Sequence, residues 1–213
     1  MTDPSATADL SPVVGRRREA LRCAAALAGA LALPPLGHAA APAGDGSTAV
    51  ERWLREGGVV IAFRHALAPG TFDPPEFRLG DCGTQRNLND EGRAQARRIG
   101  QWFSSRGLKP ARVRSSPWCR CVDTARLAFG DPEVWPALGS PRGTPAQEVA
   151  QSLPALRQAL AAARSRRGSF EAWVTHMFVL SDLTGEGSSS GEGLVLRAEA
   201  GGAIKVLARL AIT

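Results

Sequence analysis

The sequence contains no tyrosine, and Lys109 and Lys205 are its only lysines among 213 residues. Its formal net charge of +6 therefore comes almost wholly from arginine. A modest basic excess favours anionic ligands. However, no basic stripe with interleaved aromatic residues is present, and any base stacking would depend on tryptophan and phenylalanine. These absences argue against nucleic acid as the partner.

Cysteine is also scarce, and its spacing argues against a structural zinc site. The chain has four cysteines, and the one close pair, Cys119 and Cys121, has Cys-x-Cys spacing. A zinc site needs about four ligands at suitable spacing. We therefore expect no metal site in this protein.

Hydrophobic runs long enough to span a membrane are missing as well. The apolar stretch 23–37 offers about 14 consecutive apolar residues, which suits the core of a signal peptide but not a transmembrane helix. It follows Arg16-Arg17-Arg18 and precedes the small residues Ala39-Ala40-Ala41, and "GRRREAL" resembles a twin-arginine signal. We expect residues 1–41 to be an export leader of a periplasmic protein and residues 42–213 to form one domain. The alternatives are a disordered alanine-rich leader or a short anchor.

Export determines what the cysteines can do. Cys23 would leave with the leader, whereas Cys82, Cys119 and Cys121 would enter an oxidising compartment. Disulfides form and persist in such compartments. We expect one disulfide, which joins Cys82 to either Cys119 or Cys121.

The order of the elements predicts the fold. The apolar run 59–64 is typical of a strand covered on both faces, and further strands are expected at 111–116 and 170–176. The stretch 195–212 reads as a hairpin that turns at Gly201-Gly202. Helices are expected between the strands, at 48–56, at 90–106 after the cap Asn89, at 117–129, and after the capping box Thr144–Gln147 with an interruption near Pro154. This alternation predicts a three-layer α/β/α fold with a mostly parallel central sheet and a C-terminal β-hairpin.

Both histidines outside the leader stand at strand ends. His65 follows the strand 59–64, and His176 ends the strand 170–176. In folds of this class, ligands bind beyond the carboxyl ends of the strands. A strand-end histidine taken singly is more often a structural or surface residue. The two together favour a shared site.

Two arginines are expected beside these histidines. Arg64 adjoins His65, and Arg120 lies in the first turn of the helix that follows the second strand. Arginine binds phosphate through two parallel hydrogen bonds to its oxygens, and a neutral imidazole is a competent nucleophile toward phosphorus. The helix start would add free backbone N–H groups for an anion. The set predicts a phosphate site, although a helix-surface arginine alone is more often a solvated charge.

Five segments resemble the motifs of one family, and they occur in the family's order. They are "FRHALAPG", "LNDEGRAQARRIG", "SSPWCRCVDTA", "WVTHMFVLSDLTG" and "SGEGLVLR". They resemble the histidine phosphatase superfamily, the phosphoglycerate mutase-like proteins, from about residue 57 to 210. The segments "CGTQRNLNDEG" and "SSPWCRC" are similar to the sequences of an exported subgroup, which is grouped with lipopolysaccharide core heptose phosphatases.

The resemblance implies a role for each candidate residue. His65 would attack phosphorus and carry a phosphohistidine intermediate, Arg64 and Arg120 would hold the phosphate oxygens, and His176 would stabilise the transferring group. Positioning and charge neutralisation suffice for such a transfer, so no metal or other cofactor is implied. The implied substrate is a small-molecule or lipopolysaccharide phosphomonoester, which water finally releases as phosphate.

Met177 differs from the family pattern, so the identity of the proton donor stays open. Met177 follows His176 where the acid-phosphatase branch of the family has an aspartate. A donor for the leaving group would then come from the loop 66–88, and we rank Asp81 first because a disulfide at Cys82 could fix it near Arg120. The other candidates are Glu76, Asp123 and Asp182. Without a donor, substrates with good leaving groups are favoured, or the protein is a non-catalytic phosphate- or phosphosugar-binding relative.

Overall fold

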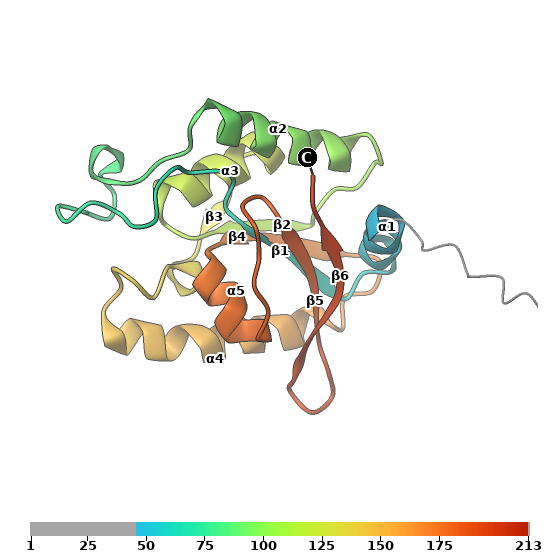
Figure 1. The fold of residues 1–213 in the computed structure, drawn as a ribbon. Helices are drawn as coiled ribbons and strands as arrows, with labels where there is room; N and C mark the ends of the chain where they lie inside the picture. Colours follow the sequence, from blue (N-terminus) through green and yellow to red (C-terminus); the bar gives the residue numbers. More distant parts are fainter. Residues whose placement is uncertain (1–45, 213) are drawn as a thin grey trace, which may run out of the picture. The chain divides into compact units, whose positions relative to one another are not determined.

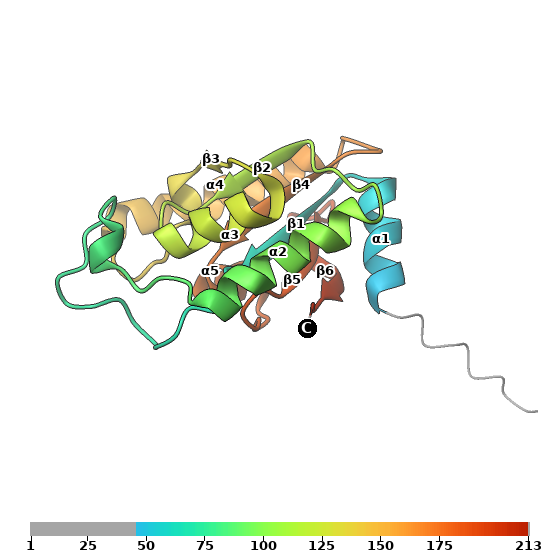
Figure 2. The same cartoon turned by 90° about the horizontal axis from the view of Figure 1, so that it is seen from above.

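The computed structural model describes residues 46–212, and the expected export leader, residues 1–41, lies outside the described residues. A six-stranded sheet in the order β3-β2-β4-β1-β5-β6 forms the middle layer. Figure 1 shows α2 and α3 on one face of this sheet and α4 and α5 on the other, and Figure 2 shows the same layers from above. The strands are β1 (Val59–Arg64), β2 (Arg112–Ser115), β3 (Glu133–Val134), β4 (Phe170–Thr175), β5 (Gly193–Ala198) and β6 (Ile204–Leu210). The α-helices are α1 (Gly46–Glu56), α2 (Asp90–Ser104), α3 (Cys119–Phe129), α4 (Ala146–Ala163) and α5 (Met177–Thr184).

The sheet is parallel on one side and antiparallel on the other. β1 pairs in parallel with β4, β4 with β2, and β2 with β3. β5 runs antiparallel to β1, and β6 runs antiparallel to β5. The predicted three-layer α/β fold with a mostly parallel sheet and a C-terminal hairpin is therefore confirmed.

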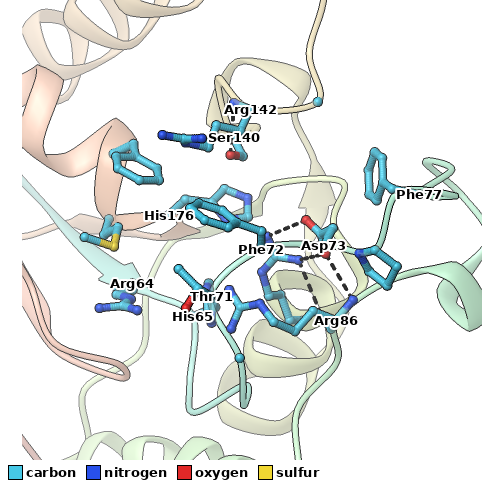
Figure 3. A pocket seen from close by; sticks show the side chains of 16 residues that line it. Arg64, His65, Thr71, Phe72, Asp73, Phe77, Arg86, Ser140, Arg142 and His176 are labelled. Atoms are coloured by element: carbon cyan, nitrogen blue, oxygen red, sulfur yellow. Dashed lines mark hydrogen bonds and ion pairs between the residues drawn. The ribbon is translucent and has the colours of Figure 1, made fainter.

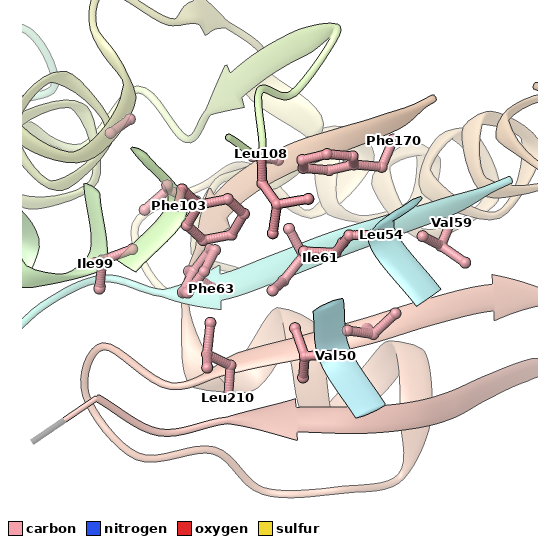
Figure 4. Packing of buried hydrophobic residues seen from close by; sticks show 14 of the residues in the cluster. Val50, Leu54, Val59, Ile61, Phe63, Ile99, Phe103, Leu108, Phe170 and Leu210 are labelled. Carbon is pink, nitrogen blue, oxygen red and sulfur yellow. The ribbon is translucent and has the colours of Figure 1, made fainter. Parts of the chain in front are cut away.

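Alternation along β1 divides the core into two layers. Ile61 and Phe63 pack with α1, α2 and α3 on one face (Figure 4), whereas Val60 and Ala62 pack with α4 and α5 on the other. All four side chains are fully buried. A strand covered on both faces needs apolar residues at every position, which explains the unbroken apolar run.

Helix α2 begins where its sequence predicts. The Asn89 side chain accepts a hydrogen bond from the Gly92 amide at 2.8 Å, which caps the helix. A Cβ at Gly92 would lie 2.0 Å from the carbonyl oxygen of Leu67, so this glycine lets the helix approach the loop after β1. The helix ends at Ser104, two residues before the predicted end.

Helix α4 differs from the prediction in two ways. It runs without interruption through Pro154. Pro154 is exposed, and so is Ala150, whose carbonyl loses its helical partner and can be hydrated instead. The predicted capping box is also wrong, because the Thr144 hydroxyl donates to the Ser140 carbonyl at 2.7 Å and Pro145 occupies the cap position.

The short helix α5 was not predicted. It has only eight residues, and its N-cap residue, His176, makes no capping hydrogen bond with its side chain. It ends at Gly185, which has φ 77°, a left-handed conformation that favours glycine. Within residues 46–212, no helix has the length and apolarity that a membrane crossing requires.

Candidate active site

The sheet brings the two histidines together. β1 and β4 are neighbours, and Arg64 lies opposite Thr175 in their register. The next residue of each strand is a histidine, and the ring centroids of His65 and His176 lie 5.6 Å apart. Both side chains are buried, with 2% and 3% exposure. The predicted convergence of the two imidazoles is confirmed.

One hydrogen bond fixes the tautomer of His65. Its Nδ1 lies 2.7 Å from the carbonyl oxygen of Ala66. Because a carbonyl can only accept, Nδ1 carries the proton and Nε2 keeps its lone pair. The Ala66 amide in turn donates to the Thr124 hydroxyl on α3 at 3.0 Å. Helix α3 therefore helps to fix the Ala66 backbone whose carbonyl orients the His65 ring.

Burial keeps the His65 imidazole neutral. Desolvation lowers the pKa of His65 to about 3, against the opposing hydrogen bond to Ala66. The nearby charges of Arg120, Arg86 and Arg64 contribute to this lowered pKa. A ring with this pKa holds its lone pair at neutral pH, as a nucleophile requires.

His176 has the opposite tautomer. Its Nδ1 lies 3.5 Å from a guanidinium nitrogen of Arg120, which can only donate, and its Nε2 lies 2.8 Å from the Ser116 hydroxyl. Nδ1 therefore accepts and Nε2 carries the proton. Burial, followed by the charge of Arg120, holds the pKa of His176 well below its ordinary value.

Four arginines line one cavity of about 430 Å³ together with the histidines (Figure 3), and the charges of three of them, Arg64, Arg86 and Arg120, act on His65. Arg120 is buried at 4% exposure, as part of α3. Arg64 donates to the Ser188 carbonyl at 2.9 Å, and Arg86 donates to the Ala68 carbonyl. Burial and then the charge of Arg120 lower the pKa of Arg64 and Arg86, so these like charges destabilise one another. An anion in the cavity would relieve that repulsion.

Asp73 is a cavity residue that sequence analysis missed. Its carboxylate accepts two bonds from Arg120, at 2.8 and 3.2 Å, and one from the Arg86 amide at 3.0 Å. Desolvation acts to raise the pKa of Asp73, but the hydrogen bonds from Arg120 and the Arg86 backbone outweigh it, so the pKa lies below its ordinary value. Asp73 is therefore ionised and orients Arg120.

The structure does not bring Asp81 to the cavity. The Asp81 carboxylate accepts from the Gly83 amide at 3.1 Å and pairs with Arg78 at 3.1 Å, so it caps the short helix Cys82–Thr84. The residues that line the cavity include none of the other acids considered, Glu76, Asp123 and Asp182. In the described part of the chain, Asp73 is the one carboxylate among the lining residues.

The disulfide joins Cys82 to Cys119 and leaves Cys121 free and buried. It therefore ties the loop after β1 to the residue before Arg120. The first amide of α3 does not face an anion, contrary to prediction, because the Cys119 N–H donates to the Gln85 side chain at 3.0 Å. Burial raises the pKa of the Cys121 thiol to about 12, so it stays protonated.

Arg86, Arg142 and Asp73 line the cavity from loops, and sequence analysis singled out none of them. Arg86 stands inside "GTQRNLN", but nothing local separates it from the many other arginines. No three His, Cys, Asp or Glu side chains of residues 46–212 are grouped so that they could hold a metal ion. The arrangement combines a neutral, oriented imidazole with a cationic cavity, which suits transfer of an anionic group.

The lowered pKa values predict the titration of both rings. We expect the imidazole signals of His65 and His176 to stay constant between about pH 5 and pH 8 in two-dimensional NMR, because neither ring takes up a proton there. The unfolded chain binds protons at these rings below about pH 6.5, so stability decreases as the pH falls from there toward 3. An inflection near pH 6.5 in either signal would contradict this account, and a His65→Asn variant assigns the signals.

Comparisons with known proteins show a similarity in sequence over one segment and a similarity in fold. Residues 78–169 match the model for the histidine phosphatase superfamily (branch 1), and no curated protein matches the sequence. The structure of the protein histidine phosphatase SixA with tungstate is similar, with 19% identity, a TM-score of 0.50, and coverage of 72% of this chain and 96% of that one.

Two further solved structures share the fold. For a mutant phosphoserine phosphatase from Entamoeba histolytica in complex with phosphoserine, the identity is 12% and the TM-score 0.51, with 71% of this chain and 95% of that one covered. For the α-ribazole phosphatase from Shigella flexneri, the identity is 15% and the TM-score 0.50, with 73% and 98% covered. Identities this low establish a common fold only. The chain is therefore similar in sequence to the histidine phosphatase superfamily over residues 78–169, and it shares its fold with these phosphatases.

Proposed function

We propose that the protein is a metal-independent phosphatase that hydrolyses a phosphomonoester through a phosphohistidine on His65. The observation that carries this proposal is the state of His65. Its ring is neutral, its Nδ1–H is held by the Ala66 carbonyl, and its Nε2 lone pair is left in a cavity lined by four arginines. The family match supports phosphatase chemistry in general terms.

The reaction follows two displacements at phosphorus. In the first, the Nε2 lone pair of His65 forms a bond to phosphorus while the ester P–O bond breaks and its electrons leave with the oxygen. In the second, water attacks the phosphohistidine, the P–N bond breaks, and phosphate leaves with His65 neutral again. Arg64, Arg86 and Arg120 neutralise the phosphoryl oxygens in both steps.

Asp73 and His176 act on the same arginine from two sides. Asp73 binds Arg120 through both carboxylate oxygens, and His176 Nδ1 lies 3.5 Å from a nitrogen of the same guanidinium. Preorganised donors of this kind need no rearrangement when charge develops in the transition state. His176 and Asp73 therefore position Arg120 for the transferring group.

A chelator assay tests the proposed function. The purified domain, residues 42–213, should hydrolyse p-nitrophenyl phosphate, and excess EDTA should leave the rate unchanged because the residues named above supply all the charge neutralisation. Vanadate should inhibit it. Absence of turnover on any aryl phosphate, or loss of turnover in EDTA that Mg²⁺ or Zn²⁺ restores, would contradict the proposal.

One observation favours a second candidate, a non-catalytic phosphate- or phosphosugar-binding protein. Asp73, the carboxylate that lines the cavity, is ionised and bound to Arg120, so it cannot protonate a leaving group. This candidate predicts phosphate binding by calorimetry without turnover of any ester. Detectable turnover by the wild-type domain excludes it.

We also propose that the protein is exported and acts on a phosphorylated sugar of the cell envelope, as in lipopolysaccharide core heptose phosphatases. The leader-like sequence 1–41 and the disulfide between Cys82 and Cys119, which needs an oxidising compartment, support export. A reporter fused after residue 45 should appear in the periplasm, and Arg16→Lys with Arg17→Lys should retain it in the cytoplasm. Retention of the unchanged fusion would contradict export.

A further inference from the structure

Arg142 lies apart from the three arginines that surround His65. It belongs to the segment between the 3₁₀ turn Pro136–Leu138 and helix α4, and its side chain lines the cavity. Figure 3 shows it across the cavity from Arg64 and Arg86. A phosphoryl group held at His65 would therefore place its leaving group between the two sides.

Two aromatic rings hold the Arg142 guanidinium. Its central carbon lies 4.8 Å from the ring centroid of Phe72, on the loop after β1, and 5.2 Å from that of Phe178, on α5. Contacts with ring faces stabilise a guanidinium without using its N–H donors. Asp73, the carboxylate that lines the cavity in the described part of the chain, is engaged by Arg120 through both oxygens. The Arg142 donors therefore remain available for an anion.

The charge of the cavity also leaves room for a second anion. Four lining arginines oppose one ionised carboxylate, and both histidines are neutral, so the cavity carries a net charge of about three positive units. A phosphomonoester dianion offsets about two of these. One further negative charge on the leaving group would neutralise the cavity.

We propose that Arg142, held between Phe72 and Phe178, binds a second anionic group, such as a carboxylate, on the leaving group of the substrate. The proposal rests on the proposed function for the position of the transferring phosphoryl group. It narrows the substrate class to phosphomonoesters whose leaving group carries its own negative charge. A guanidinium with its edges free can bind a carboxylate through two parallel hydrogen bonds.

Non-hydrolysable ligands test this proposal independently of turnover. Calorimetry compares phenylphosphonate, 3-carboxyphenylphosphonate and 4-carboxyphenylphosphonate, with 3-carbamoylphenylphosphonate as an uncharged match. We expect wild type to bind the better of the two carboxylates about tenfold more tightly than the carbamoyl ligand. Arg142→Gln should reduce that preference to about one, and Arg142→Lys should retain part of it. The matched control, Arg157→Gln on the exposed side of α4, should keep the full preference.

Three outcomes would overturn the proposal. Wild type could show no preference for a carboxylate ligand, the preference could survive Arg142→Gln, or that variant could lose affinity equally for all four ligands. The last result would mean that Arg142 supports the phosphoryl end or the cavity itself. Phosphonates are not hydrolysed, so their binding is measured separately from catalysis. If wild type prefers the carboxylate ligand through Arg142 but does not turn over p-nitrophenyl phosphate, the phosphatase function is rejected and the second anion site is kept.

Discussion

Replacing His65 by alanine is expected to lower the turnover number on p-nitrophenyl phosphate by about 10⁴-fold or more. This variant removes the proposed nucleophile, and the arginines alone cannot replace the proposed covalent step. Initial rates of purified wild type and variant, measured in EDTA over a range of substrate concentrations, give the comparison. We expect the turnover number to change much more than KM.

His65→Asn is the matched control for this change. The asparagine amide can still donate to the Ala66 carbonyl, as Nδ1 does at 2.7 Å, but it has no nucleophilic nitrogen. We expect this variant to bind phosphate with an affinity close to wild type and to be as inactive as the alanine variant. Turnover close to wild type in either variant would remove His65 from the mechanism.

The second large effect concerns the leaving group. 4-Nitrophenyl and 4-nitrobenzyl phosphate have nearly the same size, but the second releases an alkoxide that needs a proton. The cavity offers no protonated carboxyl among the described residues, since Asp73 is ionised and Asp81 lies elsewhere. General acid catalysis contributes about 10²–10⁴-fold. We therefore expect kcat/KM for the nitrobenzyl ester to be about 10³-fold lower.

Asp73→Asn separates proton donation from positioning. If Asp73 only orients Arg120, the variant slows both esters and leaves the ratio of their kcat/KM values unchanged. If Asp73 donates a proton, the nitrobenzyl ester slows much more than the nitrophenyl ester. Similar kcat/KM values for both esters in wild type would mean that a group in residues 46–212 does donate a proton to the leaving group, which would contradict this expectation.

The sequence was sufficient to predict those features that depend on a single strand or helix. The unbroken apolar run of β1 follows from burial on both faces, and the helix cap at Asn89 follows from a local hydrogen bond. The convergence of His65 and His176 required one further rule, that ligands bind at the carboxyl ends of parallel strands. The structure adds that β1 and β4 are immediate neighbours in register, which places the two rings in contact.

The remaining site residues depend on contacts far apart in sequence. Asp73 meets Arg120 across 47 positions, and a loop without regular structure gives no periodic signal for such a contact. Asp81 was ranked first because it adjoins Cys82, but its side chain turns to Gly83 and Arg78 instead. A disulfide fixes the backbone near its cysteines but not the direction of the neighbouring side chain. Spacing alone also could not decide between Cys119 and Cys121 as the partner of Cys82.

Detection of the covalent intermediate tests the proposed role of His65 most directly. Wild-type protein mixed with excess p-nitrophenyl phosphate is quenched in base, which preserves phosphoramidates, digested and sequenced by tandem mass spectrometry. We expect one phosphoryl group on His65, which disappears as substrate is exhausted and never forms in His65→Asn. Phosphorylation of His176 instead, or steady turnover with no phosphoryl group on either histidine, would contradict it.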